Sequence, residues 1–232
     1  MEKKRLFSVL SIFLAIVMVL SVITLPSIDA KADTKTTAIN NFITNWYKVA
    51  LGRKPNKSEL TSWRKELTSG TTCGARAAYG FVFSDEYKKK KKSNDAYVTD
   101  LYKLMLGRTP DSKGKADWVK KLKNGTSREQ VFAGFANSGE YYKICSNLGI
   151  TAGYWAAGVD PNKLNNVNMF VNRLYDICLG RLGDQGGQAD WTGKLISGKT
   201  TGSQCAHDFI FSDEYVKKNL TDGAYVKNLY KA

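Results

Sequence analysis

Apolar residues recur at helical spacing through most of the chain. Between residues 97 and 105 they lie three or four positions apart, which is typical of an amphipathic helix with one buried face. A second helix follows from a cap at Asp111, a third opens at Ser127 with capping-box spacing, and a short fourth starts at Ser138. After the first 32 residues, no segment sustains the alternation of a strand. We therefore predict an all-α fold of tandem small helical bundles, with three to four helices in each.

This helical pattern occurs three times, over residues 42–87, 97–141 and 170–215. Each copy has Leu-Gly-Arg near the end of its first helix, a Trp ten residues after the Arg, and a late Ser-x-Glu-Tyr. The recurring Gly, Arg, Trp and Glu are Gly52, Arg53, Trp63 and Glu86 in the first copy, Gly107, Arg108, Trp118 and Glu140 in the second, and Gly180, Arg181, Trp191 and Glu214 in the third. A unit of about forty-five residues is near the lower limit for an independent core, so we expect neighbouring copies to share buried surface.

The spacing of the copies shows a second level of order. The aromatic residues that open successive copies are 55, 73 and 55 residues apart, so a pair of copies is the larger unit. The predicted organisation is a signal peptide at 1–32, repeat 1 at 33–93, repeat 2 at 94–146, a Gly- and Asn-rich connection at 147–168, repeat 3 at 169–221 and the start of an incomplete repeat 4 at 222–232. Two explanations of the incomplete copy stay open: the sequence is a piece of a longer protein, which we favour, or the last helix caps the third copy.

The first residues have the pattern of an export signal. A basic start at 3–5 precedes an apolar run at 6–25, and residues 30–32, Ala-Lys-Ala, have the small side chains of a cleavage site. We expect a secreted or cell-surface protein that begins at Asp33. An uncleaved signal would instead anchor the protein in a membrane, because the apolar run is long enough to span one.

The chain is strongly basic, with a net charge of +14 from 35 Lys and Arg against 21 Asp and Glu. Since nucleic acid is scarce outside a cell, the expected partners are an anionic cell-wall polymer, a glycan or an extracellular protein, and no nucleic acid. The candidate contact for teichoic acid or anionic lipid is the run Lys88, Lys89, Lys90, Lys91 and Lys92. The alternative is a solvated basic surface in which the lysines only favour the end of a helix.

These motifs resemble those of a bacterial family known as domain of unknown function 4214, whose repeats contain Leu-Gly-Arg, Pro-Asp-x-x-Gly, Trp and Phe-x-x-Ser-x-Glu-Phe/Tyr. That family is similar to the helical linker domain of phycobilisomes, so the resemblance implies a compact helical fold and a role in holding components together. The second copy fits best, whereas Asn56 replaces the Asp of the first copy and Ser58 and Glu59 stand where the Gly is expected. Because Asn can replace Asp as a helix cap, the departure favours capping over calcium binding.

The Arg and the late Glu of each copy predict an ion pair that ties the first helix to the last. Breaking such a pair when buried would cost about 3–5 kcal/mol; the alternative is an Arg that binds an acidic ligand. We expect each Trp to pack in the core, because it lies four residues before a Leu in an apolar stripe. A row of Trp rings stacking on sugars is the alternative. In the connection, Tyr154 and Trp155 are better candidates for exposed aromatic contact.

Four cysteines in an exported chain permit two disulfides. We expect Cys178 to pair with Cys205 within the third copy, which leaves Cys73 to pair with Cys145. The alternative is a set of buried free thiols, which behave as small apolar side chains.

Catalytic groupings are missing from the sequence. The only histidine is His207, no Ser-His-Asp or Cys-His arrangement recurs through the copies, and no phosphate-binding Gly loop follows a strand. We therefore expect no enzyme activity, no cofactor and no metal. The predicted function is a secreted, non-catalytic helical repeat module that acts as an interaction or scaffold domain at the cell envelope. The alternatives are a spacer or assembly domain of a larger extracellular enzyme such as a glycan hydrolase, or a glycan hydrolase itself, which needs a cleft with convergent acids.

Overall fold

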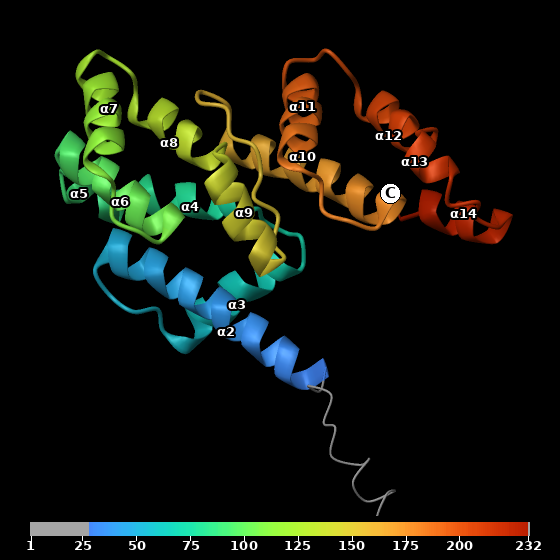
Figure 1. Ribbon diagram of the computed structural model, residues 1–232, viewed down its shortest axis with the longest axis horizontal. Helices are drawn as coiled ribbons and strands as arrows, with labels where there is room; N and C mark the ends of the chain where they lie inside the picture. Colours follow the sequence, from blue (N-terminus) through green and yellow to red (C-terminus); the bar gives the residue numbers. More distant parts are fainter. Residues whose placement is uncertain (1–27, 232) are drawn as a thin grey trace, which may run out of the picture. The chain divides into compact units, whose positions relative to one another are not determined.

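The computed structural model describes residues 28–231, with side chains from residue 32 (Figure 1). Most of the predicted export signal lies outside these residues and stays a prediction. The chain divides into a segment that ends at Ala38 and a unit that begins at Ile39. The described residues form helices and no strand, so the all-α prediction is confirmed. Among these helices, none combines the length and the apolar character needed to span a bilayer.

The same order of helices is found in all three copies (Figure 1). The first copy contains α2 (Ile28–Trp46) with a π-helical turn η2 (Tyr47–Leu51), then α3 (Lys57–Thr68), α4 (Gly74–Val82) and α5 (Asp85–Lys89). The second contains α6 (Asn94–Leu106), α7 (Ser112–Lys123), α8 (Arg128–Ala136) and α9 (Gly139–Leu148). The third contains α10 (Pro161–Leu174) with the turn η3 (Tyr175–Leu179), α11 (Gln185–Ile196), α12 (Gly202–Ile210) and α13 (Asp213–Val216), and α14 (Asp222–Leu229) follows it.

Local sequence determines where these helices begin and end. The Gly of each Leu-Gly-Arg motif ends the first helix in the left-handed region, with φ of 76° at Gly52, 66° at Gly107 and 71° at Gly180, where a residue with a Cβ would be strained. The second helix of the second copy begins at the side chain of Asp111, which accepts a hydrogen bond from the backbone of Gly114. In the first copy, Asn56 accepts the equivalent bond. The predicted capping role of this position is therefore confirmed.

The described residues of the second unit bury two separate cores. The larger core contains the first two copies together with part of the connection, and the ring of Phe83 meets that of Phe132 edge-on at 5.8 Å. The smaller core belongs to the third copy and contains Val171, Leu174 and Phe209 among others. The first and second copies therefore share buried surface, as expected for a pair of small repeats.

Candidate functional site

Each copy builds one aromatic cluster around its arginine, which we call the motif cluster. The motif clusters are Tyr47, Arg53, Trp63 and Phe81 in the first copy, Tyr102, Arg108, Trp118 and Phe135 in the second, and Tyr175, Arg181, Trp191 and Phe209 in the third. The guanidinium carbon lies 4.8, 4.9 and 5.1 Å from the centre of the Tyr ring in these copies, a cation–π distance. The Phe ring meets the Tyr ring edge-on at 4.9, 4.9 and 4.8 Å. The residues of the repeated motif therefore make the same packing contacts in all three copies.

The tyrosine of this cluster was not singled out from the sequence, whereas the phenylalanine opens the Phe-x-x-Ser-x-Glu-Phe/Tyr pattern. The tyrosine stands six residues before the arginine in all three copies, at Tyr47, Tyr102 and Tyr175. That constant spacing was the signal that would have found it. The three rings are buried or half-buried and the guanidinium group lies over the Tyr ring, which explains why the motif extends beyond Leu-Gly-Arg.

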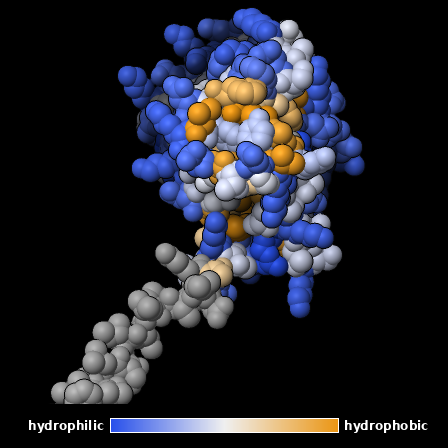
Figure 2. All heavy atoms as spheres, turned by 90° about the vertical axis from the view of Figure 1, so that its right-hand side faces the viewer, coloured by the Kyte–Doolittle hydropathy of each residue, from blue (hydrophilic) through white to orange (hydrophobic). Residues whose placement is uncertain are grey.

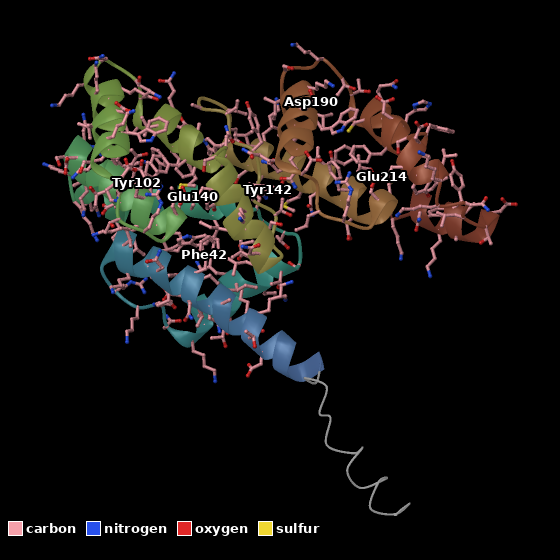
Figure 3. All side chains as sticks on the ribbon, in the orientation of Figure 1. Phe42, Tyr102, Glu140, Tyr142, Asp190 and Glu214 are labelled. Atoms are coloured by element: carbon pink, nitrogen blue, oxygen red, sulfur yellow. The ribbon has the colours of Figure 1, made fainter. Side chains whose placement is uncertain are left out.

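The arginine of the second and third copies also binds the late glutamate. Arg108 donates to both carboxylate oxygens of Glu140, from Nε at 2.6 Å and from Nη2 at 3.0 Å. Figure 3 labels Glu140 and, in the third copy, Glu214. Arg181 binds Glu214 in the same way, at 2.8 and 3.0 Å. These hydrogen bonds lower the pKa of both carboxyl groups. The side chains of Arg108 and Glu140 are 42% and 43% exposed, however, so the larger cost expected of a buried pair does not apply.

The first copy corrects the predicted pairing. Arg53 does not bind Glu86; its two Nη atoms donate to the carboxylate oxygens of Glu59 at 2.9 and 2.7 Å, and this lowers the pKa of Glu59 to about 2. Glu59 occupies the position that is glycine in the other copies, where a Cβ would meet the hydroxyl of Tyr102 at Gly114 and that of Tyr175 at Gly187. Glu59 lies in the first turn of α3, the helix that follows Arg53, and its carboxylate therefore takes the place that the late glutamate has in the other copies.

Replacing Glu140 with glutamine should lower the free energy of unfolding by about 0.2–1 kcal/mol at neutral pH, the range of exposed ion pairs. Because the folded-state pKa of Glu140 is lowered, its contribution is present above the ordinary pKa of Glu and is lost as the pH falls through the lowered pKa. Urea unfolding at neutral and acidic pH measures both effects. Glu86→Gln is the matched control, since Arg53 binds Glu59 instead. An equal loss in both variants would contradict the role of the ion pair.

The tryptophan of each motif cluster is half-buried and lies against a core; these are Trp63, Trp118 and Trp191. Trp63 borders a shallow cleft of about 200 Å³ in the first copy, and Trp191 borders an equivalent cleft of about 160 Å³ in the third. Tyr47 and Phe81 line the first cleft and are each only 4% exposed, so these two rings present little surface to a ligand. The Trp ring of each copy packs against the Phe ring of its cluster, with centroid distances of 5.5, 5.3 and 5.5 Å.

The connection between the pairs does not present an exposed tryptophan. Trp155 is 1% exposed, stacks on Tyr79 at 4.5 Å and meets Phe132 edge-on at 5.3 Å. The side chain of Asn137 binds both backbone groups of Trp155 at 2.8 Å. The expectation of exposed aromatic contact at Trp155 is therefore wrong, because the apolar ring fills the core that the first two copies share.

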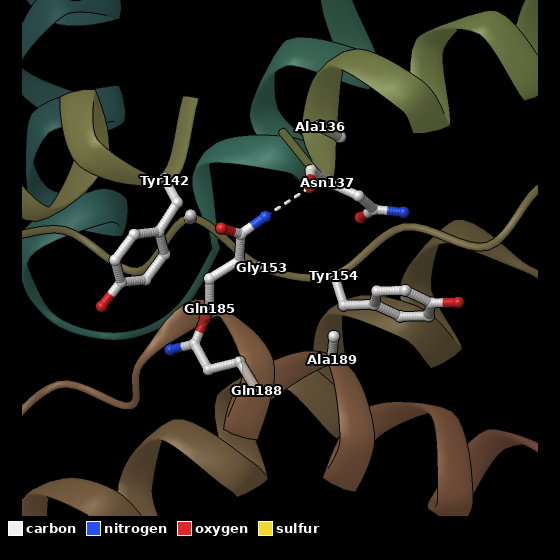
Figure 4. A pocket seen from close by; sticks show the side chains of 9 residues that line it. Ala136, Asn137, Tyr142, Gly153, Tyr154, Gln185, Gln188 and Ala189 are labelled. Carbon is white, nitrogen blue, oxygen red and sulfur yellow. Dashed lines mark hydrogen bonds between the residues drawn. The ribbon is translucent and has the colours of Figure 1, made fainter. Parts of the chain in front are cut away.

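A small cavity lies where the second copy meets the third (Figure 4). Asn137, Tyr142 and Gly153 line one side of it, and Gln185 and Gln188 line the other. The amide of Gln185 donates to the backbone oxygen of Asn137 at 2.5 Å, and the Tyr142 hydroxyl donates to that of Gly183 at 2.9 Å. With a volume of about 20 Å³, the cavity has room for a single water molecule, so it serves the junction and no larger ligand.

All four cysteines are buried free thiols, which corrects the predicted disulfides Cys178–Cys205 and Cys73–Cys145. Burial raises the pKa of Cys73 and that of Cys205 to about 11, so both thiols are protonated at neutral pH. The cysteines fill core volume as small apolar side chains, which was the alternative for these positions.

The lysine run at 88–92 divides into two groups. Lys90 donates to the backbone oxygen of Ala50 at 2.7 Å, and Lys92 pairs with the buried carboxylate of Asp100 at 3.2 Å. Lys90 therefore fixes the end of the first copy to its own first helix, and Lys92 ties the first copy to the second. The other three, Lys88, Lys89 and Lys91, are exposed to solvent.

The metal-binding side-chain types do not gather in the described residues. No group of three or more His, Cys, Asp or Glu side chains in that part of the chain is placed to hold a metal ion. His207 is exposed, with its Nδ1 atom 3.3 Å from the carboxylate of the neighbouring Asp208.

Three helical copies, each built around the same aromatic and arginine cluster, define a tandem-repeat helical protein. The chain belongs to the family described as a domain of unknown function, DUF4214, whose model matches residues 25–90, 78–145 and 162–218. No curated protein and no solved structure matches the chain. The likeness to the phycobilisome linker domain stays an expectation from the sequence.

Proposed function

We propose that the protein is a secreted, non-catalytic helical repeat module that binds an anionic polymer of the cell envelope. The observation that carries the proposal is that the recurrent arginines have partners within their own copies, while other basic side chains stay exposed to solvent. The recurrent arginines bind a Tyr ring and a carboxylate inside each copy. A large excess of positive charge remains, +14 for the full sequence and +12 from Asp33 onward, because residues 1–32 carry four basic and two acidic side chains. A polyanion is the natural ligand of a surface of this kind.

Exposed lysines gather at two places in the first pair of copies. Lys88, Lys89 and Lys91 lie at and after the end of α5, and Lys120, Lys121 and Lys123 lie in the last turn of α7. Both groups favour the negative end of a helix while their charges face solvent. Several such groups can contact a flexible anionic polymer at once, which supports an interaction role.

The chemistry of the nucleophiles supports a non-catalytic module. Burial raises the pKa of the Cys145 thiol and of the Cys178 thiol, as it does for the other two cysteines. A thiol of this kind is a poor nucleophile, because the thiolate is the reactive form. The Nδ1 atom of the exposed His207 lies 3.3 Å from a carboxylate oxygen of the neighbouring Asp208.

The triple variant Lys88→Gln, Lys89→Gln and Lys91→Gln should retain its fold and bind purified wall teichoic acid at least about fivefold more weakly at low salt. This lower bound corresponds to the roughly 1 kcal/mol that a single Lys contributes near an anionic surface. Binding of the variant should also depend less steeply on salt, because fewer exposed charges are screened. Retention on immobilised polymer across a salt series measures both effects.

The control removes the same charge outside both lysine groups, through Lys57→Gln, Lys163→Gln and Lys199→Gln. These three lysines are exposed and lie on different helices or loops of the first and third copies. An equal effect of both triple variants would mean that total charge and not the run at 88–91 determines binding. No salt-sensitive retention of the unaltered protein would defeat the proposal.

A further inference from the structure

An apolar surface lies at the last helices of the chain. The large apolar side chains that are exposed in the described residues all fall between 211 and 230; they are Phe211, Val216, Val226, Leu229 and Tyr230, with exposed fractions of 61%, 61%, 47%, 41% and 90%. We call them the C-terminal apolar patch. Figure 2 shows the face on which hydrophobic residues gather around a paler centre. Beside them lies a hollow of about 320 Å³, lined by Ile210, Tyr215, Leu220 and Tyr225 among others.

The chain contains its own comparison for this patch. Residues 170–231 repeat residues 42–103 at a constant interval of 128 positions, so each patch residue has a counterpart in the first pair of copies. The counterparts of Val226, Leu229 and Tyr230 are Val98, Leu101 and Tyr102, which are exposed by only 0%, 0% and 5%. The same surface is therefore covered in the first pair and open at the end of the third copy.

Helix α8 of the second copy covers this surface in the first pair. Phe132 from this helix meets Phe83 edge-on at 5.8 Å, and Phe135 meets Tyr102 edge-on at 4.9 Å. The two phenylalanines are three residues apart, so they project from one face of α8. Helices α7 and α9 pack against α6 beside it.

The counterparts of the residues that α8 contacts are present and open in the third copy. Phe211 stands at the position of Phe83, and Tyr230 stands at the position of Tyr102. Val216 replaces the exposed Lys88, so the third copy extends the apolar surface where the first copy carries a charge. Lys231, the last described residue, corresponds to Lys103, so no described residue provides the equivalent of α7, α8 and α9.

Arg128 adds a polar contact that the third copy can also accept. In the first pair, the hydroxyl of Tyr97 donates to the backbone oxygen of Arg128 at 2.7 Å, and the guanidinium of Arg128 lies 4.9 Å from the Tyr97 ring centre. Tyr225 stands at the position of Tyr97 and lines the hollow beside the patch. An entering helix with Arg-x-x-x-Phe-x-x-Phe could therefore make all three contacts.

From this internal comparison, we propose that the C-terminal apolar patch is a docking surface for a helical repeat of the second class. The docking helix has the Arg-x-x-x-Phe-x-x-Phe pattern of α8, and its two phenylalanines pack on Phe211 and Tyr230. This surface is distinct from the lysine groups of the proposed function. The interaction does not require an anionic polymer.

Binding of a synthetic peptide that spans residues 112–148 tests this proposal. This peptide contains the residues of α7 to α9. It is fluorescently labelled and titrated with the full protein, and its fluorescence anisotropy is recorded. We expect saturable binding that weakens at least about tenfold in the protein variant Phe211→Glu, as for a central contact residue. The double change Phe132→Ala and Phe135→Ala in the peptide should weaken binding to a similar degree.

The protein variant Lys199→Gln is the charge-matched control. Lys199 is exposed in the third copy outside the patch, and its replacement lowers the net charge by one, as Phe211→Glu does. This variant should bind the peptide as the unaltered protein does. Circular dichroism of Phe211→Glu should be unchanged, since this side chain is 61% exposed. Absence of saturable binding, or equal binding by Phe211→Glu, would overturn the proposal. Sedimentation that shows a dimer dependent on Phe211 would also overturn it, because a second copy of this chain would then be the occupant.

Discussion

Replacing Trp155 with alanine should lower the free energy of unfolding by about 3–5 kcal/mol, the largest effect we expect of a single side chain. The ring is 1% exposed and lies between Tyr79 and Phe132, so its removal leaves a cavity in the core shared by the first two copies. The backbone around it is fixed by Asn137, which limits how far the connection can collapse into the space. Urea unfolding followed by circular dichroism measures the change.

Tyr154→Ala is the neighbouring control. The Tyr154 side chain is half-buried, while its backbone is bound by Asn168 at 2.7 and 2.9 Å in the way that Asn137 binds Trp155. Its removal should cost clearly less than that of Trp155. Trp155→Phe, which keeps an aromatic ring in the core, should fall between the two and gives a measurable variant if the alanine protein does not fold. Equal costs for Trp155→Ala and Tyr154→Ala would show that the ring is not part of the shared core.

The second large effect is expected of Gly153→Ala. Gly153 has φ of 81°, a left-handed conformation that costs an L-residue roughly 1–2 kcal/mol. A Cβ at this position would also meet the sulfur of the buried Cys73, with the Cβ of Cys73 at 2.9 Å. Such overpacking adds about 1–3 kcal/mol. Unfolding in urea should therefore show a marked loss of stability.

Gly158 provides a control with the same backbone conformation. Its φ is 82°, yet a Cβ built there has no atom within 4 Å, so Gly158→Ala measures the conformational cost alone. The difference between the two variants is the cost of the contact with Cys73. Combining Gly153→Ala with Cys73→Ala should recover part of that difference, as expected of side chains in contact. Equal costs for the two glycine variants would mean that Cys73 moves aside freely.

The elements of this fold could be predicted because their signals are local. The caps at Asn56 and Asp111 and the glycines of the Leu-Gly-Arg motifs act within one turn of the helix that they begin or end. Apolar spacing placed the buried faces in the same way. Repetition added a second source of information, since a pattern found in three copies is not an accident of one segment.

The partners of the charged and aromatic residues depend on contacts that no local pattern contains. Arg53 has two carboxylates within reach in the sequence motif, and only the geometry shows that Glu59 is bound and not Glu86. Trp155 looked exposed because it lies among glycines in a connection, yet that connection folds into the core of the preceding pair. The cysteines suggested disulfides by their number, whereas their burial explains them as core residues.

The exchange of Glu59 for the glycine at positions 114 and 187 has a consequence for how such repeats diverge. The guanidinium stays over the Tyr ring in all three copies, while its acidic partner comes from one helix in the first and from another in the others. The position of the glutamate that binds the arginine thus differs among the copies, whereas the contact between the arginine and the tyrosine is the same in all three. A relative that lacks the late glutamate can still keep this architecture, provided that it retains the tyrosine six residues before the arginine.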